Sequence, residues 1–244
     1  MELQKLSNLP HILWINLNKD EIRKEYMESE FKKYNLPNTR IEALEGVKYK
    51  DFCITNKVLE TSEDTGTIGC FCSHIKALEH FVNNPSIGDY CLIAEDDLSF
   101  EYIPYWKKSF WEYIKEAPSN FNIIQLTVTY SYQYMIYRKF PRTHTITKQL
   151  PYMYGAGLYM VTRKGATMLL SLISKSNNIY DLRGVQNAIS DCFLYEAIDD
   201  VYSIPLFTFN TQMGSNIHSD HIDRIHIPCK NVITRIWKKM NKLL

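Results

Sequence analysis

Short apolar runs alternate with segments of helical periodicity along this chain. Continuous apolar runs predict buried strands at 12–17, 90–94, 122–128, 157–162 and 201–207. Apolar residues spaced three and four apart predict helices at 20–33, 73–82, 106–115 and 163–174, the second of them with Ser73 as its N-cap. Segment 46–66 has no clear period and is expected to form a loop. The alternation of strands and helices predicts an α/β fold with a largely parallel central sheet.

The C-terminal segment 229–244 differs in pattern from the rest of the chain, and residues 1–228 are expected to form a single domain without a linker. As a helix, the segment collects apolar side chains on one face and basic ones on the other. The apolar face holds Ile233, Ile236, Trp237, Met240 and Leu244, and the basic face holds Arg235, Lys238, Lys239 and Lys242. Such a helix either lies in the interface of an anionic membrane surface or packs on the core of its own domain, and the pattern leaves both open.

Composition narrows the classes of partner. Hydrophobic residues make up 45% of the 244 residues and charged residues 23%, as in an ordinary globular domain. The formal net charge is +1, so we expect no nucleic-acid partner. The six cysteines form no C-x-x-C pair and no zinc-ligand spacing, which favours reduced thiols in the core. Without a signal-peptide pattern or an apolar stretch of about 20 residues, the expected location is the cytoplasm or the inner face of a membrane.

Three consecutive acids follow the predicted strand at 90–94. Glu95, Asp96 and Asp97 stand where a strand ordinarily ends in a turn. Clustered carboxylates repel one another unless a cation neutralises them, and alternate residues of an extended segment point the same way, so Glu95 and Asp97 are candidate ligands of one ion. Hard oxygen ligands suit Mg²⁺ or Mn²⁺, which can bridge the phosphates of a nucleotide. The alternative is a solvated acidic turn.

Four separated stretches together resemble glycosyltransferase family 25, the family of lipooligosaccharide and collagen galactosyltransferases. They are Trp14-Ile15-Asn16-Leu17 with Arg23 and Met27; Gly69-Cys70-Phe71-Cys72-Ser73-His74; the strand and triplet at 90–97; and 154–166, followed by Asp191, Pro205 and Gln212. The resemblance covers the chain from about residue 11 to residue 216. One departure concerns Asp191, because Ala188-Ile189-Ser190 precede it where the family usually has a proline-containing stretch.

The resemblance implies a GT-A type fold, a UDP-sugar donor such as UDP-galactose, a divalent metal (Mn²⁺ or Mg²⁺), inversion at the anomeric carbon and a glycan or glycolipid acceptor such as lipooligosaccharide. It also suggests roles for individual residues. The donor-site candidates are Asn16, Arg23, Ser73, His74, Glu95, Asp96, Gly155, Gly157 and Gln212. The metal-ligand candidates are Glu95, Asp97 and a C-terminal histidine, for which His218 is preferred over His221 and His226.

Asp191 is the candidate base that takes the proton of the acceptor hydroxyl. The alternative for Asp191 is a first-turn aspartate that stabilises a helix start, and for Arg23 it is a solvated position on a charged helix. Two other functions stay open at this level. A metal-dependent phosphohydrolase could be built on the same acidic strand end, and a noncatalytic glycan-binding protein could descend from the same family.

Overall fold

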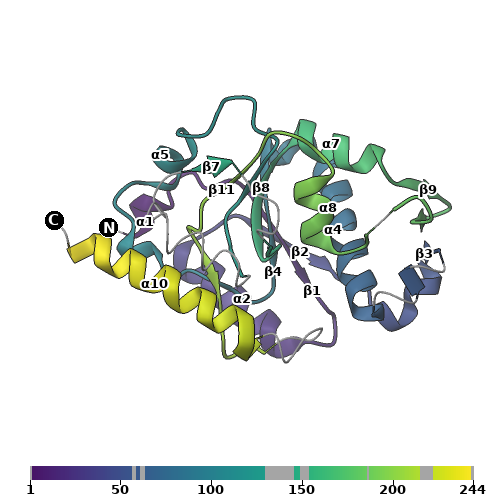
Figure 1. Cartoon of the computed structure of the whole chain (residues 1–244), viewed down its shortest axis with the longest axis horizontal. Coiled ribbons are helices and arrows are strands. Elements are labelled where there is room, and N and C mark those ends of the chain that lie inside the picture. The colour runs from purple at the N-terminus through teal and green to yellow at the C-terminus, as the bar shows by residue number, and fades with distance from the viewer. Residues whose placement is uncertain are drawn as a thin grey trace.

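The computed structural model describes residues 2–56, 59–60, 64–129, 146–148, 154–185, 187–214 and 222–242. Its centre is a seven-stranded sheet with helices packed on both faces (Figure 1). The strands follow the spatial order β2-β1-β4-β8-β6-β11-β7. Strands β8 and β7 run antiparallel to their neighbours, and the others all point the same way. This confirms the prediction of an α/β fold with a largely parallel sheet.

The elements have the following bounds. The central sheet consists of β1 (Ile12–Asn16), β2 (Asn38–Glu42), β4 (Tyr90–Glu95), β6 (Ile123–Gln125), β7 (Thr147–Lys148), β8 (Leu158–Thr162) and β11 (Val201–Ser203). A small sheet joins β3 (Cys53–Ile54), β10 (Ile179–Asp181) and β9 (Ser174–Ser176), and another joins β12 (Thr208–Phe209) and β5 (Leu98–Ser99). The α-helices of the described residues are α1 (Glu2–Lys5), α2 (Glu21–Tyr34), α4 (Thr65–Asn83), α5 (Phe110–Ile114), α7 (Arg163–Ser171), α8 (Ser190–Glu196) and α10 (Ile227–Lys242). Shorter turns are the 3₁₀-helices Gly46–Asp51, Pro85–Ile87 and Ile103–Tyr105 and the π-helix Ile222–His226.

Alternating side chains of the central strands supply two separate cores. On β1, Ile12 and Trp14 belong to one core and Leu13 and Ile15 to the other, and all four are buried. Helices α2, α5 and α10 cover the first core, and α4, α7 and α8 cover the second. Both faces of the sheet are therefore covered, which explains why its strands read as continuous apolar runs rather than as alternating ones.

Helix α4 is longer than the sequence pattern indicates. It starts at Thr65 rather than at the predicted Ser73, and its N-cap is Asp64, whose side chain accepts a hydrogen bond from the amide of Thr67 at 2.7 Å. Ser73 therefore lies in the middle of the helix, and its hydroxyl donates to the carbonyl of Gly69 at 2.6 Å. The predicted N-cap role of Ser73 is wrong, and part of the predicted loop at 46–66 is 3₁₀-helix, strand β3 and the start of α4.

The other predicted elements are present, and most of them are shorter; the exceptions are β4, which extends to Glu95, and α2, which is shifted by one residue. The predicted strands correspond to β1, β4, β6, β8 and β11, and the last ends at Ser203, two residues before Pro205, which has no N–H to donate. The helix predicted at 106–115 is only Phe110–Ile114, because Ser109 and Glu112 form a capping box that fixes its start. The helix predicted at 163–174 gives way to β9 at its end.

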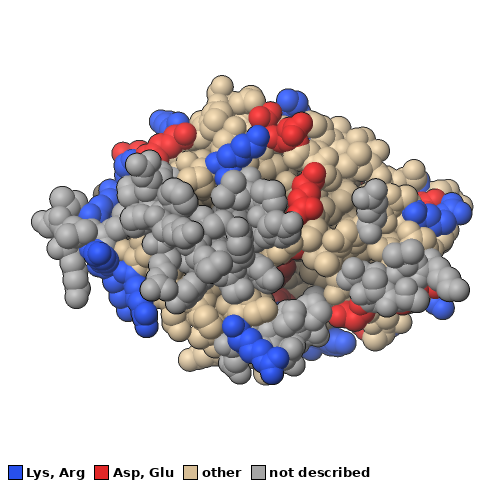
Figure 2. Space-filling model, in the orientation of Figure 1, with Lys and Arg blue, Asp and Glu red and all other residues tan. Residues whose placement is uncertain are grey.

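Helix α10 packs its apolar face onto the first core. Cys229, Ile233 and Trp237 are at most 2% exposed, whereas Arg235 and Lys238 are exposed. Figure 2 shows basic side chains on the outer side of this helix. The structure thus favours the packed helix, and the hypothesis of a membrane-surface helix finds no support, because the apolar side chains it needs lie inside the domain. Outside the described part lie the side chains of Met240, Lys242 and Leu244. Among the described residues, no helix has the length and apolar character needed to cross a membrane.

Trp237→Ala is expected to destabilise the domain by about 3–5 kcal/mol. The indole is fully buried, lies 6.2 Å from the ring of Tyr113 between centroids, and donates its Nε1–H to the carbonyl of Pro205 at 3.1 Å. The substitution opens a cavity and removes the donor of a buried carbonyl. Urea unfolding followed by circular dichroism measures the effect, with Lys238→Ala as the exposed control on the same helix. A loss below about 1 kcal/mol would show that α10 is not part of the core.

Candidate active site

The candidate site lies at the edge of the central sheet where β1, β4 and β6 end. Strands β1 and β4 pair in parallel, so their last residues, Asn16 and Glu95, lie at the same edge. Strand β8 is antiparallel to β4, so its start lies there too, and the amide of Glu95 donates to the carbonyl of Gly157 at 3.0 Å. Ligands of open α/β sheets bind outside these strand ends. Segments far apart in the sequence therefore meet at one edge.

Two adjoining hollows open at this edge. The first, of about 490 Å³, is lined by the end of β1, the segment 43–47 and the first turn of α4. The second, of about 420 Å³, is lined by the segment 154–157 and the start of α8. Cys70, Glu95 and Asp97 line both hollows, so the two meet at these side chains. Figure 2 shows acidic atoms inside a hollow near the middle of the visible face. Both volumes fall in the range of small-ligand sites.

Arg23, in the first turn of α2, pairs with two acids of the triplet. Its guanidinium forms ion pairs with Asp96 and with Asp97, the second at 3.0 Å. Asn16 donates its side-chain N–H to Asp96 at 2.7 Å, and both of these residues are at most 5% exposed. Asp96 is thus held largely inside the protein and lines only the first hollow, whereas Glu95 and Asp97 line both. Arg23 organises the triplet and lines the first hollow at the same time.

Negative charge in the triplet exceeds the positive charge paired with it. In the described part of the chain, Asp96 and Asp97 share Arg23, and Glu95 contacts His74. Burial raises the pKa of Asp97 to about 7, and the charges of Glu95 and Asp96 add to the shift although Arg23 opposes it. Burial alone would also raise the pKa of Glu95, but the hydrogen bond and charge of His74 lower it below its ordinary value. An added cation would be stabilised at this place.

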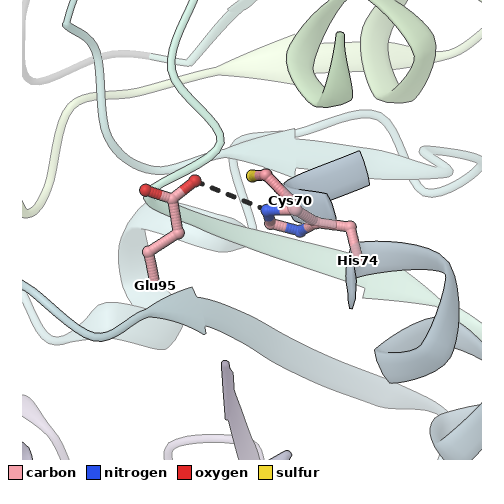
Figure 3. Close-up of side chains that lie close together, drawn as sticks. All are labelled: Cys70, His74 and Glu95. Atoms are coloured by element: carbon pink, nitrogen blue, oxygen red, sulfur yellow. Dashed lines mark hydrogen bonds and ion pairs between the residues drawn. The ribbon is translucent and has the colours of Figure 1, made fainter. Parts of the chain in front are cut away.

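Cys70 and His74 lie one turn apart on α4 and face Glu95 (Figure 3). Their potential ligand atoms and a carboxylate oxygen of Glu95 all lie within 4.8 Å of one another. The Nε2 atom of His74 is 3.4 Å from Glu95, and its Nδ1 atom is 3.2 Å from the hydroxyl of Tyr159. The sulfur of Cys70 is 3.4 Å from the hydroxyl of Ser190. Burial raises the pKa of the Cys70 thiol well above its ordinary value, and the charge of Glu95 adds to this shift, so the thiol is protonated at neutral pH.

Asp191 lies in the first turn of α8 and lines the second hollow. One carboxylate oxygen accepts from the amide of Gly155 at 2.8 Å and the other from the amide of Cys192 at 3.0 Å. Burial raises the pKa of Asp191, and the charge of Glu95 adds to the shift although the two N–H donors oppose it. The carboxylate is therefore fixed in place with increased proton affinity, as a general base requires. Its position in the first turn of α8 is also compatible with the alternative role, in which Asp191 stabilises the start of the helix.

Gly155 and Gly157 form a wall of the second hollow beside two threonines. Gly155 has φ +121°, and a Cβ there would lie 2.7 Å from Oγ1 of Thr129. A Cβ on Gly157 would lie 3.1 Å from Oγ1 of Thr127. Both glycines line the hollow, and Gly155 in addition anchors Asp191. The absence of side chains lets this segment approach the threonines and leaves its backbone facing the cavity.

Gly155→Ala is expected to lower both thermal stability and the transfer activity that the family resemblance implies. The new methyl group would overlap with Oγ1 of Thr129, at 2.7 Å, in a backbone conformation that L-residues rarely adopt, which costs about 1–3 kcal/mol. The shift of this segment also moves the N–H that holds Asp191. Thermal unfolding and initial transfer rates measure the two effects. Gly184→Ala is the control, because a Cβ there meets nothing within 4 Å. Equal melting temperatures for the two variants would contradict the proposed strain.

The remaining predicted residues lie in different surroundings. Ser73 lines the first hollow, although it is only 1% exposed. Gln212 is exposed and belongs to the lining of neither hollow. His218 and His221 lie outside the described residues, so the preference for His218 stays a prediction. His226, the third histidine of this segment, lines the second hollow.

Cys70 is the residue of this site that the sequence reasoning misses. It lies at the junction of the two hollows, four residues before His74 on the same helix. A spacing of four on a helix places two side chains on one face, which is a readable signal. The predicted helix start at Ser73 conceals it, because Cys70 then falls in a loop. Extending the apolar period back through Ile68 would have revealed the pair.

Comparisons with known proteins give one family match, and it agrees with these features of the chain. A sequence profile of glycosyltransferase family 25, described as an LPS biosynthesis protein, matches residues 9–183. Asn16, the acidic triplet and the two glycines fall inside the match, whereas Asp191 and Gln212 lie beyond it. The chain also aligns with a solved structure described as "Crystal structure of a glycosyltransferase involved in the glycosylation of the major capsid of PBCV-1", with a TM-score of 0.42, 10% identity, and coverage of 92% of this chain and 98% of that one. A search of curated proteins finds no match.

Proposed function

Because the chain belongs to glycosyltransferase family 25, we propose that it transfers a sugar from a nucleotide donor, with inversion, to a hydroxyl group of a glycan acceptor. The observation that supports this reading best is the junction of the two hollows. Glu95 and Asp97 lie at that junction, and Asp191 lines the second hollow only. One hollow can thus hold the nucleotide and the other the reacting sugar and the acceptor, with carboxylates at the place where the two substrates meet.

The first hollow suits the nucleotide part of the donor. Arg23 and segment 43–47 line this hollow with polar groups for a base and ribose, and the buried side chain of Asn16 holds Asp96 at its edge. The first turn of α4 lines the same hollow, and the positive end of a helix dipole favours phosphate. These features support a GT-A type donor site. We assign UDP-galactose as the donor and a lipopolysaccharide-type glycan as the acceptor, in line with the family described as LPS biosynthesis proteins.

The residues at the junction fit a hard divalent cation. The triplet has three carboxylates; burial raises the pKa of Asp97, and the charges of Glu95 and Asp96 add to the shift although Arg23 opposes it. Carboxylate oxygens are the ligands that Mn²⁺ and Mg²⁺ prefer, whereas the protonated thiol of Cys70 is not. Glu95 and Asp97 would hold the ion. When bound, such an ion offsets the negative charge that develops on a departing nucleoside diphosphate.

Asp191 is assigned as the base of the transfer. The acceptor oxygen forms a bond with the anomeric carbon while the bond from that carbon to the diphosphate oxygen breaks. The hydroxyl proton passes to the carboxylate of Asp191, which its two backbone donors hold in one orientation. The attack comes from the face opposite the leaving nucleotide, so the configuration at the anomeric carbon inverts. Arg23 and Asn16 hold Asp96, and through it the triplet, in place.

A donor screen tests this proposal. The purified full-length chain is incubated with a panel of UDP-, GDP- and CMP-sugars and a lipooligosaccharide acceptor, with and without Mn²⁺, and nucleotide release is measured. We expect UDP release from UDP-galactose that depends on both Mn²⁺ and acceptor. Release of inorganic phosphate from phosphate esters without acceptor would support the phosphohydrolase instead. Glycan binding without turnover of any donor would support the noncatalytic protein.

A further inference from the structure

We propose that Cys70, His74 and Glu95 form a binding site for Zn²⁺, separate from the Mn²⁺ site assigned to Glu95 and Asp97 but sharing Glu95 with it. The spacing of the cysteines alone predicts no zinc site, and the pair Cys70 and His74 becomes apparent only once α4 is known to begin at Thr65. The three groups come from two elements: Cys70 and His74 from one face of α4, and Glu95 from the end of β4 (Figure 3).

The geometry is close to that of a three-ligand zinc site. Sulfur, Nε2 and carboxylate oxygen lie within 4.8 Å of one another, and the Nε2–oxygen pair is already at 3.4 Å. Ligands on a tetrahedral Zn²⁺ lie roughly 3.3–3.8 Å apart, given bond lengths of about 2.0–2.3 Å, so small side-chain rotations close the set. On the other side of the ring, Nδ1 of His74 lies 3.2 Å from the hydroxyl of Tyr159, which fixes the imidazole orientation as outer partners of metal ligands do.

An ion can reach this cluster from the cavity. Once three protein ligands are bound, a fourth coordination position stays open. His74 is only 1% exposed, but Cys70 and Glu95 line both hollows, so the open side of the cluster faces the cavity. Zn²⁺ binds thiolate, imidazole and carboxylate ligands, whereas Mn²⁺ prefers oxygen. On binding, the sulfur forms a bond to Zn²⁺ and the thiol proton passes to solvent. The set therefore selects a thiophilic cation over the hard cation of the proposed reaction.

Sharing of Glu95 has a functional consequence that rests on the proposed function. An ion held by Cys70 and His74 takes Glu95 away from the Mn²⁺ site and stands at the junction of the two hollows. Zn²⁺ is then an inhibitor of transfer that competes with Mn²⁺, and removal of the Cys70 thiol relieves the inhibition. The binding site itself does not depend on the reaction.

Cobalt substitution tests the site without any activity measurement. Co²⁺ is titrated into the full-length protein, and a sulfur-to-cobalt charge-transfer band in the near ultraviolet is expected, which Zn²⁺ then bleaches. Cys70→Ser should abolish the band. Cys192→Ser should keep it, because Cys192 lines the second hollow but is not part of the cluster. Absence of the band in the wild type, or its persistence in Cys70→Ser, overturns the proposal.

Thiol protection in the unmodified chain gives a second readout that needs no variant. Cys70 is the one cysteine of the six, all within described residues, that is not buried. Saturating Zn²⁺ should slow its alkylation, followed by mass spectrometry, at least about tenfold, and Mn²⁺ should not. In His74→Gln, Zn²⁺ affinity should fall more than about tenfold, because even outer partners of metal ligands contribute ten- to hundredfold. Equal alkylation rates with and without Zn²⁺ would rule the site out even if transfer activity is never found.

Discussion

Asp97→Asn is expected to lower the rate of sugar transfer by about a thousandfold or more and to remove the Mn²⁺-dependent part of UDP affinity. Asp97 lines both hollows and is one of the two carboxylates assigned to the ion. An asparagine keeps the shape and its oxygen can still accept from Arg23, but the negative charge that holds the cation is gone. A metal contributes several kcal/mol to stabilising a leaving diphosphate, which corresponds to a thousandfold in rate. Calorimetry of UDP binding with and without Mn²⁺ and single-turnover rates measure the two effects.

Folding should not suffer in this variant. Burial and the neighbouring acids raise the pKa of Asp97 to about 7, so the ionised carboxylate is disfavoured in the folded state and a neutral amide removes that penalty. We therefore expect an equal or higher melting temperature together with the lost activity. Asp181→Asn is the matched control. Asp181 also forms an ion pair with an arginine, Arg183, but it lies on β10 in the small sheet that contains β3. Unchanged Mn²⁺-dependent UDP affinity in Asp97→Asn would remove Asp97 from the metal site.

The sequence predicts five of the seven strands of the central sheet, which are largely buried, but not the edge strands β2 and β7, which are polar and partly exposed. Runs such as the one around Leu92 are apolar without interruption, and only a sheet covered on both sides requires that. The same runs locate the candidate site, since acids and glycines at the strand ends must meet at one edge.

The ends of the helices and strands are harder to predict from the sequence. Helix α4 begins with Gly66 and Gly69 in its first turns, residues of low helix propensity that the tertiary contacts override. A Cβ on Gly69 would lie 2.6 Å from backbone of Gly46, so close packing explains that glycine.

Contacts between distant segments could not be read from the sequence. The pattern around Arg23 is compatible with a solvated side chain and also with an arginine that binds phosphate. Neither interpretation indicates that Arg23 pairs with two acids more than 70 residues away. The C-terminal helix is a similar case. A basic face opposite Trp237 is the composition of a membrane-surface helix and also of a helix packed on a core. Only the tertiary structure distinguishes them, because burial of the indole depends on the partner surface that includes Tyr113.

Asp191→Asn is expected to lower turnover by about a hundredfold or more while donor binding stays within a few-fold of wild type. The amide occupies the volume of the carboxylate and can still accept from the amide of Gly155, but it cannot take a proton from the acceptor. Asp191 lines only the second hollow, so the nucleotide part of the site is left unchanged. Single-turnover transfer and UDP calorimetry separate the two quantities. Glu196→Gln, an exposed substitution on the same helix, is the control for loss of a negative charge on α8.

The pH profile distinguishes a base from a positioning residue. The ionised carboxylate is the active form of a base, so wild-type turnover should fall as the pH falls through the pKa of Asp191, which burial raises above the ordinary aspartate value. At saturating Mn²⁺, which keeps Asp97 ionised, this acidic limb should disappear in Asp191→Asn and the small residual rate should be flat in that range. If Asp191 only anchors Gly155 at the start of α8, the variant instead keeps the acidic limb. Its turnover then falls in parallel with its melting temperature, and the base must be sought among the other groups that line the second hollow.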